Sequence, residues 1–583
     1  MTRRRGKKPP RSIGNVARAG EHTVRTFQVG AVPLLADIFK RMNLVEILRR
    51  HLPPDSSRTI VPTAETLQLL ATNLLITRQP IYGVGDWAGG YAPDLFGLSG
   101  TQLSRLQDDR IGRCLDRLFR INIPDLVLEV VRHVVNEFDL RLEELHNDST
   151  TVSFHGNYEA AQSPGERLGI PTIALTWGHS KDHRPDLKQL LYILTVTDDG
   201  GIPIYFTTAD GNTTDDETHI DTWNILRELV GHSDFLYVAD CKLASSSNME
   251  HIDRRGGKFI TVLPRTRKEN TAFRDRIHRE PDALSWERLE ERVDANGQVV
   301  DVISVLQEER WSKENFRVLW FHSTRKARQD AIARIEKVER AGQDLEALRD
   351  KLSSPKTRYR ERAKVEKAVE SILADRGVQS FLHVEIHEQE NEEFRQAQRG
   401  RPGKNTQYVR TVKRRFSISW KVDADGLARE ESGDGLFPLI TNHLELSALE
   451  VYEAYKRQPF IEKRFSQFKN DFAVAPVFLK SVTRIQALLA VYFFALMAQT
   501  LLERQVRTSM DNAGVDTLPI YPEERSCACP TTPRIIDVFS GVQRIRVSFG
   551  GETTETVTQL THPQKQVLQL LGVSRRTYGH RAS

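Results

Sequence analysis

Three side chains with different chemistry recur at seven-residue steps within residues 446–470. Tyr455, Glu462 and Lys469 present a phenol, a carboxylate and an ammonium group at positions i, i+7 and i+14. Because seven residues make nearly two turns of an α-helix, one helix would carry all three groups along a single face. A surface helix with solvated charges would have the same spacing, so a site requires partners elsewhere in the chain.

Two aspartates lie far upstream, each in or at the end of a strand-like segment. Asp148 follows the run LEELHN, and Asp240 ends the short apolar run FLYVAD. From residue 141 the patterns predict a strand, a β-hairpin, a helix, a strand, a helix and a strand, in that order. This order is typical of a ribonuclease-H-like mixed sheet, in which the first and fourth strands are neighbours. We therefore expect Asp148 and Asp240 to lie side by side.

Carboxylates in this arrangement predict metal-dependent chemistry. Two facing carboxylates raise each other's pKa unless a cation lies between them. With Glu462 as a third ligand they would form an oxygen-rich site for Mg²⁺, with Mn²⁺ as a substitute. Two such ions about 4 Å apart support an in-line phosphoryl displacement. We interpret five other acids as ordinary loop or helix-start residues: Asp182, Asp198, Asp199, Asp215 and Asp216.

Positive charge is concentrated in two segments, although the net charge is only +5 over 583 residues. Residues 1–25 carry eight Lys or Arg against one acid, and residues 395–420 carry eight against none. Local basic segments on a nearly balanced chain indicate a polyanionic partner. In the first segment, a flexible arm, we expect DNA contacts from Arg3, Arg4, Arg5, Lys7 and Lys8.

Cysteine content and hydropathy indicate a cytoplasmic protein. Four cysteines are too few for a disulfide framework, and no apolar segment of a secretory signal follows the basic N-terminus. Residues 485–502 contain no charge, but Gln486, Gln499 and Thr500 interrupt the run. We predict a helix buried against the sheet and no membrane span.

Asp240 and Glu462 are 222 residues apart, too far for an uninterrupted core, so an insertion must separate them. Within it, residues 325–376 predict a helical hairpin. The predicted domains are a basic flexible arm (1–25), a helical DNA-end-binding domain (26–140), the first part of the ribonuclease-H-like core (141–265), the insertion (266–434), the second part of the core with the glutamate helix (435–505) and a C-terminal region for dimer contacts (506–583).

The basic segment of the insertion contains the sequence RGRP at residues 399–402, which is similar to the AT-hook element that binds the minor groove. Arginines on a flexible loop suit the negative potential of a narrow minor groove. A solvated loop is the alternative. The residues expected to contact DNA here are Arg399, Arg401, Lys404, Lys413, Arg414 and Arg415.

These motifs together resemble a known family. Asp148 in NDST, Asp240 in YVAD and the pattern Tyr455-x2-Gln458-x3-Glu462-x6-Lys469 resemble the signature of DDE transposases, within the bacterial insertion-sequence-four-like group marked YREK. The resemblance implies that the two aspartates and the glutamate bind two metal ions. It also implies that Tyr455 and Lys469 contact the DNA strand near the scissile phosphate.

One position departs from that pattern. Gln458 stands where the group usually has arginine, and it can hydrogen-bond a phosphate without adding charge. Arg457 is adjacent but about 100° around a helix, so it would replace the missing charge only in part. We expect both residues to contact DNA.

The resemblance predicts a bacterial, nucleoid-associated enzyme that performs cut-and-paste transposition. It would cleave DNA at terminal inverted repeats and transfer the strands into target DNA, acting as a homodimer on DNA. Two alternatives stay open. A ribonuclease-H-like nuclease or resolvase would share the acidic triad, and a transposase-derived DNA-binding protein would keep the fold without the catalysis.

Overall fold

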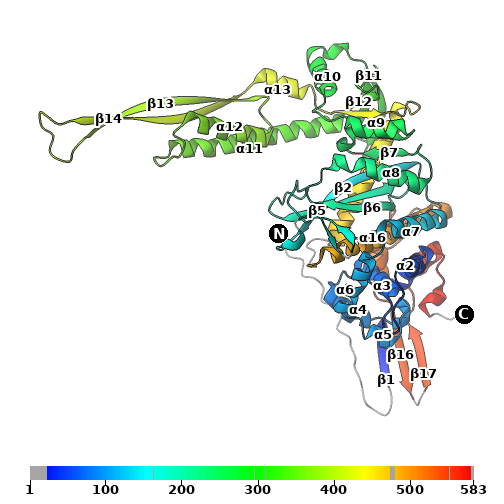
Figure 1. Cartoon of the computed structure of the whole chain (residues 1–583). Coiled ribbons are helices and arrows are strands. Elements are labelled where there is room, and N and C mark those ends of the chain that lie inside the picture. The colour runs from blue at the N-terminus through cyan, green and yellow to red at the C-terminus, as the bar shows by residue number, and fades with distance from the viewer. Residues whose placement is uncertain are drawn as a thin grey trace. The chain divides into compact units, whose positions relative to one another are not determined.

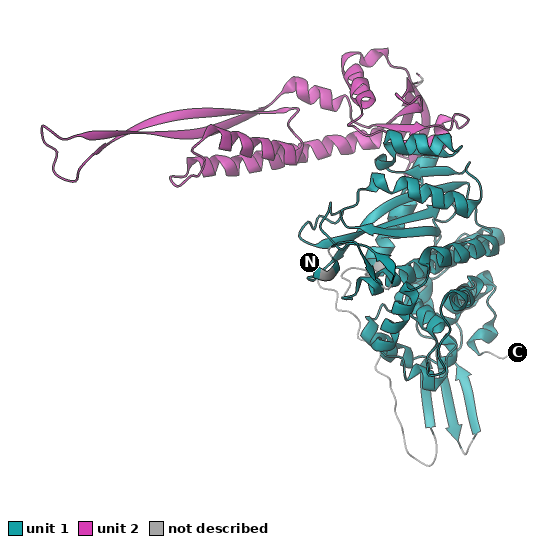
Figure 2. Cartoon of the chain, viewed as in Figure 1, with its two compact units in different colours: residues 1–260, 453–583 teal, residues 261–452 magenta. Residues whose placement is uncertain are grey.

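The computed structural model describes residues 23–579 except residues 162, 168, 295, 307, 309, 473–478 and 550–551. The predicted DNA contacts of the N-terminal arm therefore lie outside the described residues: Arg3, Arg4, Arg5, Lys7 and Lys8. The chain forms two structural units. The first contains residues 1–260 and 453–583, and the second contains residues 261–452 (Figure 2).

The first unit contains a mixed sheet with the strand order β6-β5-β2-β7-β8. β2 pairs antiparallel with β5 and parallel with β7, while β5 and β6 form the predicted hairpin. Every residue of β5 is buried, as expected for an apolar strand inside a sheet. The bounds are Glu144–Phe154 for β2, Lys188–Thr197 for β5, Pro203–Asp210 for β6, Leu236–Ala239 for β7 and Lys258–Val262 for β8.

The helices before this sheet and in its crossovers follow the predicted apolar periodicity. In the N-terminal part they are α1 (Val32–Arg41), α2 (Leu44–His51), α3 (Thr63–Ile76), α6 (Asp108–Phe119) and α7 (Ile123–Phe138) (Figure 1). The crossovers contain α8 (His219–Val230) and α9 (Ser246–Arg254). The helical character predicted for this part of the chain is thus observed.

Helix α16 (Val482–Ala513) contains the uncharged run that the sequence analysis considered as a membrane span. It is the single helix among the described residues that is long and apolar enough to cross a membrane, and 94% of its most apolar window is buried in the protein. It packs on α3, α6 and β6. A helix that is apolar on all sides is expected in a protein core, so the prediction of a buried helix is confirmed.

The two ends of the described chain fold together. β1 (Thr23–Gln28) pairs antiparallel with β16 (Gln543–Phe549), which also pairs with β17 (Glu552–Val557). The buried Tyr578 hydroxyl donates a hydrogen bond to the carbonyl of Gly30 at 3.2 Å. The last three residues of the predicted flexible arm therefore belong to a strand, because the C-terminal region supplies its hydrogen-bonding partner.

The second unit begins with an antiparallel sheet in the order β15-β12-β10-β9. Its strands β10 (Val299–Leu306) and β12 (Arg317–Ser323) correspond to the two strand-like runs expected early in the insertion. β9 spans Trp286–Val293, and β15 spans Leu436–Thr441. The sheet therefore uses residues from both ends of the predicted insertion.

A helical hairpin and a long β-hairpin complete the second unit. Helices α11 (Thr324–Ser353) and α12 (Arg362–Arg376) confirm the predicted helical hairpin. Strands β13 (Leu382–Gln396) and β14 (Tyr408–Val422) form a ribbon that extends beyond these helices (Figure 1). The apolar faces of α11 and α12 pack on the base of this ribbon. We predicted a flexible basic loop for this segment. For Tyr408–Val422 that prediction is wrong, because these residues form the paired strand β14.

Candidate active site

Strands β2 and β7 position the two predicted aspartates. In the parallel pairing of these strands Asn147 lies opposite Ala239. Asp148 and Asp240 are the next residue of each chain segment, so the expected adjacency of the two strands is confirmed. Asp240 directly follows β7 and accepts a hydrogen bond at Oδ1 from the backbone N–H of Lys242, at 3.0 Å.

The environment disfavours ionisation of both carboxyl groups. Burial, with a further contribution from the charge of Asp240, raises the pKa of Asp148 to about 6, although Lys181 acts in the opposite direction. Burial also raises the pKa of Asp240, and the charge of Asp215 adds to this effect. A cation near two such carboxylates would relieve their repulsion. The donor chemistry therefore fits a hard divalent cation.

Lys181 and Asp215 also belong to this acidic cluster. The Lys181 ammonium nitrogen lies 2.9 Å from Asp215 Oδ2 and 3.6 Å from Asp148 Oδ1. It donates hydrogen bonds at 2.7 Å to both the carbonyl and the hydroxyl oxygen of Ser149, and that hydroxyl donates to Asp215 Oδ1. Burial acts to raise the pKa of Asp215, but Lys181 and Ser149 together lower it. Asp215 is the first residue of a short 3-10 helix (Asp215–Glu217), as expected of a helix-start acid, and it also belongs to this cluster.

Tyr455 on α14 (Ala448–Lys456) and Glu462 on α15 (Pro459–Ser466) belong to the second predicted part of the core. Burial raises the pKa of Tyr455 to about 12, and the charges of Asp240, Glu462 and Asp148 act in the same direction. All three predicted carboxylates therefore act electrostatically on this tyrosine. Glu462 itself is exposed, in the first turn of its helix. Within the described residues, no group of three His, Cys, Asp or Glu side chains is close enough to hold a metal ion.

The predicted single helix for the stripe is interrupted twice. Helix α14 ends at Lys456, α15 spans Pro459–Ser466, and a π-helical turn spans Gln467–Asp471. Pro459 has no N–H to donate, so the helical hydrogen bonding is interrupted between α14 and α15. Around it the N–H groups of Gln458 and Phe460 donate three residues back, to the carbonyls of Tyr455 and Arg457. The prediction of one continuous face was therefore wrong, although Tyr455 still senses the charge of Glu462.

Lys469 lies in the π-helical turn and has a protein partner. Its ammonium nitrogen is 2.6 Å from Asp182 Oδ1. Asp182 directly follows Lys181, so one short loop contacts both the acidic cluster and this lysine. The interpretation of Asp182 as an ordinary loop acid is corrected by this contact, and Lys469 reaches a carboxylate where the sequence predicted a DNA phosphate.

Gln458 and Arg457 bind protein groups at the base of β2. Gln458 is 8% exposed, its Oε1 lies 3.0 Å from His146 Nδ1, and its Nε2 donates to the Asn147 carbonyl at 3.4 Å. Arg457 Nε donates to Glu144 Oε1 at 2.6 Å, and His146 Nε2 lies 2.8 Å from the same atom. Both side chains therefore bind protein groups in this structure, whereas the sequence predicted that they contact DNA.

The same network determines the charge of Glu144. Burial acts to raise its pKa, but the hydrogen bonds and charges of Arg457 and His146 dominate and lower the pKa to about 2. Glu144 lies on β2, four residues before Asp148. The network therefore joins the segment between α14 and α15 to the strand that carries the first aspartate.

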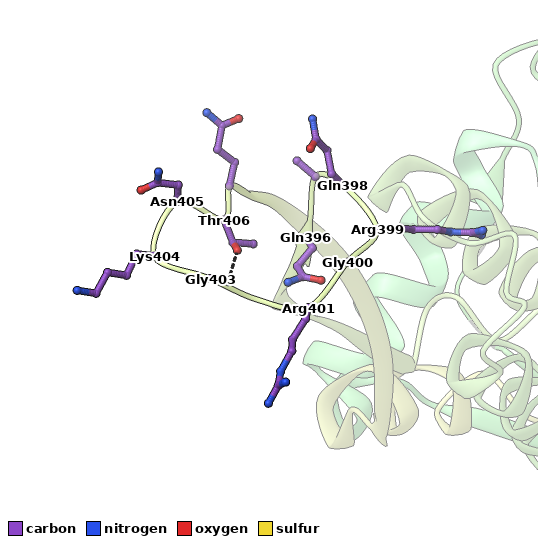
Figure 3. Close-up of a pocket in the computed structure, with 11 residues that line it drawn as sticks. Gln396, Gln398, Arg399, Gly400, Arg401, Gly403, Lys404, Asn405 and Thr406 are labelled. Atoms are coloured by element: carbon purple, nitrogen blue, oxygen red, sulfur yellow. Dashed lines mark hydrogen bonds between the residues drawn. The ribbon is translucent and has the colours of Figure 1, made fainter.

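The basic residues of the insertion divide into two groups. Three on strand β14 have acidic neighbours on β13: Lys413 Nζ lies 2.6 Å from Glu393, Arg414 Nε lies 3.0 Å from Glu390, and Arg410 pairs with Glu392. Arg415, on the same strand, is exposed and lies opposite Gln389. Arg399, Arg401 and Lys404 lie in the loop that joins the strands, and Figure 3 shows their side chains projecting in different directions. That loop contains three cations and no acid.

Asp215 and Lys181 carried little signal in the sequence. Both lie in irregular connections, where neither helical nor strand periodicity identifies the inward-facing residues. The hydroxyl cluster after Asp148 was one available signal, because Ser149 joins Lys181 to Asp215. The spacing of these residues along the chain could not show that the segments around Ser149, Lys181 and Asp215 lie together.

Comparison with known proteins identifies the class. A family profile described as "Transposase DDE domain" matches residues 143–498, which is more than half of the chain. A second profile, described as a domain of unknown function, DUF4277, matches residues 24–132. A search of curated proteins found no match.

Among solved structures, the chain is similar to the piggyBac transposase synaptic complex with hairpin DNA, with a TM-score of 0.24 and 11% sequence identity. That alignment covers 50% of this chain and 60% of the other chain, less than two thirds of its length.

The chain belongs to the DDE transposase family. Its described residues form a mixed α/β fold with a large mixed sheet.

Proposed function

We propose that this transposase cuts DNA at the terminal inverted repeats of its own element and joins the freed 3′ ends to target DNA. One observation carries the proposal. Asp148 and Asp240 follow paired positions on the adjacent parallel strands β2 and β7, and their charges and that of Glu462 all act on Tyr455. The strand order of the first unit supports a ribonuclease-H-like core for this chemistry.

In this proposal Asp148, Asp240 and Glu462 hold two Mg²⁺ ions, for which Mn²⁺ substitutes. When bound, such ions supply electrostatic stabilisation to the attacking and leaving oxygens of a phosphodiester. The two half-buried aspartates fit this role because partial burial and neighbouring negative charges raise the pKa of each, which a bound cation would offset. Glu462 is exposed near the same tyrosine, so its carboxylate has room to join them.

The remaining polar groups of the site would handle the DNA strand. Tyr455 keeps its proton at neutral pH because its pKa is about 12, so its hydroxyl group donates a hydrogen bond to a phosphate oxygen. Lys469 adds a positive charge near the scissile phosphate. Gln458 and Arg457 support the reaction through β2, since they bond to His146 and Glu144.

DNA binding outside the site would use the basic segments. We assign this role to the N-terminal arm, to the helical domain at residues 26–140 and to the β13–β14 loop, whose arginines and lysine have no acid beside them in that loop. Pairing of two element ends requires two protomers, so we propose a homodimer on DNA, with dimer contacts from the region after residue 505. We place the enzyme in the YREK group, in a bacterial cytoplasm on the nucleoid.

The test uses the DNA next to the gene. Purified protein is incubated with a labelled duplex that carries this flanking sequence, with Mg²⁺, and wild type is compared with Asp148→Asn, Asp240→Asn and Glu462→Gln. We expect cleavage at the repeat boundary that requires metal and disappears in all three variants. Asp186→Asn is the matched control, because Asp186 pairs with Arg184 at the surface, outside the cluster.

Two results would contradict the proposal. Cleavage that ignores the repeat boundary would support a ribonuclease-H-like nuclease or resolvase instead. Binding to the flanks without cleavage, in Mg²⁺ and in Mn²⁺, would support a DNA-binding protein derived from a transposase.

A further inference from the structure

The loop Ser180–Asp182 brings two opposite charges into the active site. Lys181 lies beside the acidic cluster, with its ammonium nitrogen 2.9 Å from Asp215 and 3.6 Å from Asp148. The charge of Asp240 also acts on this ammonium group. Two carboxylates thus lie beside one protein cation, and one of them, Asp148, is a residue that the proposed function assigns to metal binding.

The next residue makes the complementary contact. The Asp182 carboxylate lies 2.6 Å from the Lys469 ammonium nitrogen. In the proposed function Lys469 binds a phosphate of the DNA strand, and a carboxylate is the protein group closest to a phosphate in charge and hydrogen-bonding capacity. Asp182 therefore supplies an anion to the group that would otherwise bind DNA.

Additional contacts hold this loop in place. Lys181 donates two hydrogen bonds to Ser149, the residue after Asp148. The Ser180 hydroxyl accepts a hydrogen bond from the backbone N–H of Arg184 at 3.1 Å. The position of the loop thus depends on side chains of the active site itself, and a ligand that binds those side chains would compete with it.

We propose that the Lys181–Asp182 dipeptide is an internal stand-in for both ligands of the site, with Lys181 in the place of the metal ion and Asp182 in the place of a DNA phosphate. This inference rests on the proposed function. It adds that one loop regulates both the binding of metal and the binding of DNA. Divalent metal displaces the Lys181 ammonium group, and DNA displaces the Asp182 carboxylate.

The arrangement has two physical consequences. Lys181 offsets the repulsion among the carboxylates, so the cluster stays assembled without metal. It also competes with an added cation for the same oxygens, so it weakens metal affinity. Asp182 has the corresponding effect on DNA, because Lys469 must exchange one anion for another.

A first experiment uses the wild-type protein. Lysine side chains are labelled with an amine-reactive ester in EDTA and in saturating Mn²⁺, and the modified residues are quantified by mass spectrometry. We expect Lys181 to react faster with Mn²⁺ present, because its ammonium group leaves the carboxylates. Lys326, which pairs with Asp330 in the second unit, is the internal reference. Equal labelling of Lys181 in both conditions would overturn the inference.

A second experiment measures metal affinity directly. Mn²⁺ is titrated into wild type, Lys181→Met and the control Arg184→Met, and free Mn²⁺ is followed by its electron paramagnetic resonance signal. Lys181→Met should bind Mn²⁺ at least about tenfold more tightly. A positive charge within 4 to 6 Å of a carboxylate changes the affinity of that carboxylate for a cation such as a proton by about tenfold or more, and the variant removes this competing charge. Arg184→Met changes the same loop at a surface ion pair and should bind as wild type does.

The outcomes separate the two proposals. If neither wild type nor Lys181→Met binds Mn²⁺, the metal site of the proposed function fails. If both bind with equal affinity, the metal site stands and the role of Lys181 is refuted. Should Lys181→Met not fold, Lys181→Gln in the same titration and the labelling of wild type still decide the question.

The DNA half of the inference is tested in EDTA, where cleavage is absent. Fluorescence anisotropy with the labelled flanking duplex should show tighter binding by Asp182→Asn than by wild type, by about threefold to tenfold. The gain should vanish in the double variant Asp182→Asn/Lys469→Met. Asp186→Asn removes a carboxylate from the same loop without freeing Lys469, so an equal gain there would overturn the role of Asp182.

Discussion

The active site and the β13–β14 hairpin handle charge in opposite ways. In the site, the half-buried carboxylates of Asp148 and Asp215 share one ammonium group, that of Lys181, and the charge of Asp240 also acts on it. In the hairpin, acids on one strand pair with bases on the other, and the paired side chains are largely exposed. The excess negative charge of the acidic cluster indicates a place where a ligand would supply the counterion. The paired charges of the hairpin give no such indication.

The largest effect is expected from a substitution in the acidic cluster. Asp148→Asn should lower the rate of DNA cleavage by about a thousandfold or more, because it removes a carboxylate that we assign to metal binding. Its affinity for the flanking duplex should stay within about twofold of wild type, since we assign DNA binding mainly to the basic segments. Cleavage assays and anisotropy on the same preparation check both values.

The opposite pattern, intact cleavage with lost binding, would place Asp148 in the DNA interface. A tip variant with Arg399→Ala, Arg401→Ala and Lys404→Ala is the matched control, because it should lose affinity while keeping the acidic cluster.

Buried and exposed ion pairs should also differ in stability. Arg464 is 3% exposed and bonds to Gly200, Gly201 and Glu503. Arg464→Met should lower the free energy of unfolding by about 3–5 kcal/mol, because it leaves Glu503 buried without its main counterion. Arg410→Met removes an exposed pair of the hairpin and should cost less than about 1 kcal/mol. Chemical denaturation of both variants checks the contrast, and equal losses would contradict it.

The sequence predicted those parts of the molecule in which local pattern determines structure. The order of the predicted strands and helices placed Asp148 and Asp240 at neighbouring strands, and the apolar run of α16 identified a buried helix. Pro459, visible in the sequence, interrupts the helix that the seven-residue spacing predicted, so periodicity alone was misleading there.

Two other features depend on contacts between distant segments. Lys181 reaches Asp148 and Asp215 from an irregular connection, and no repeat in the sequence marks such a contact. The basic composition of β14 suggested free charge, but the acidic strand β13 pairs with it in register. Composition gives the charge of a segment, and only the fold shows how much of that charge is already neutralised.

DNA affinity should therefore depend on the hairpin tip more than on its paired shaft. The triple tip variant should reduce the slope of log affinity against log salt by about 2.7, if each of the three cations neutralises one phosphate. Lys413→Ala and Arg414→Ala together should change that slope by less than about one, because these side chains already pair with Glu393 and Glu390. Anisotropy titrations at several salt concentrations measure both slopes, and a larger change in the shaft variant would reverse the assignment.

The smallest expected effect concerns His219, at the start of α8. Burial lowers its pKa to about 4, while Tyr237 is its hydrogen-bond partner. An unfolded histidine, with a pKa near 6.5, binds a proton that folded His219 rejects, so its contribution to stability declines as pH falls from about 6.5 towards 4. The unfolding free energy of wild type minus that of His219→Phe should therefore fall by about 1 kcal/mol between about pH 7.5 and 5.5. Denaturant titrations at both pH values measure this difference; the raised pKa values of Asp148 and Asp240 act on both proteins alike, so a constant difference would show that His219 titrates normally in the folded state.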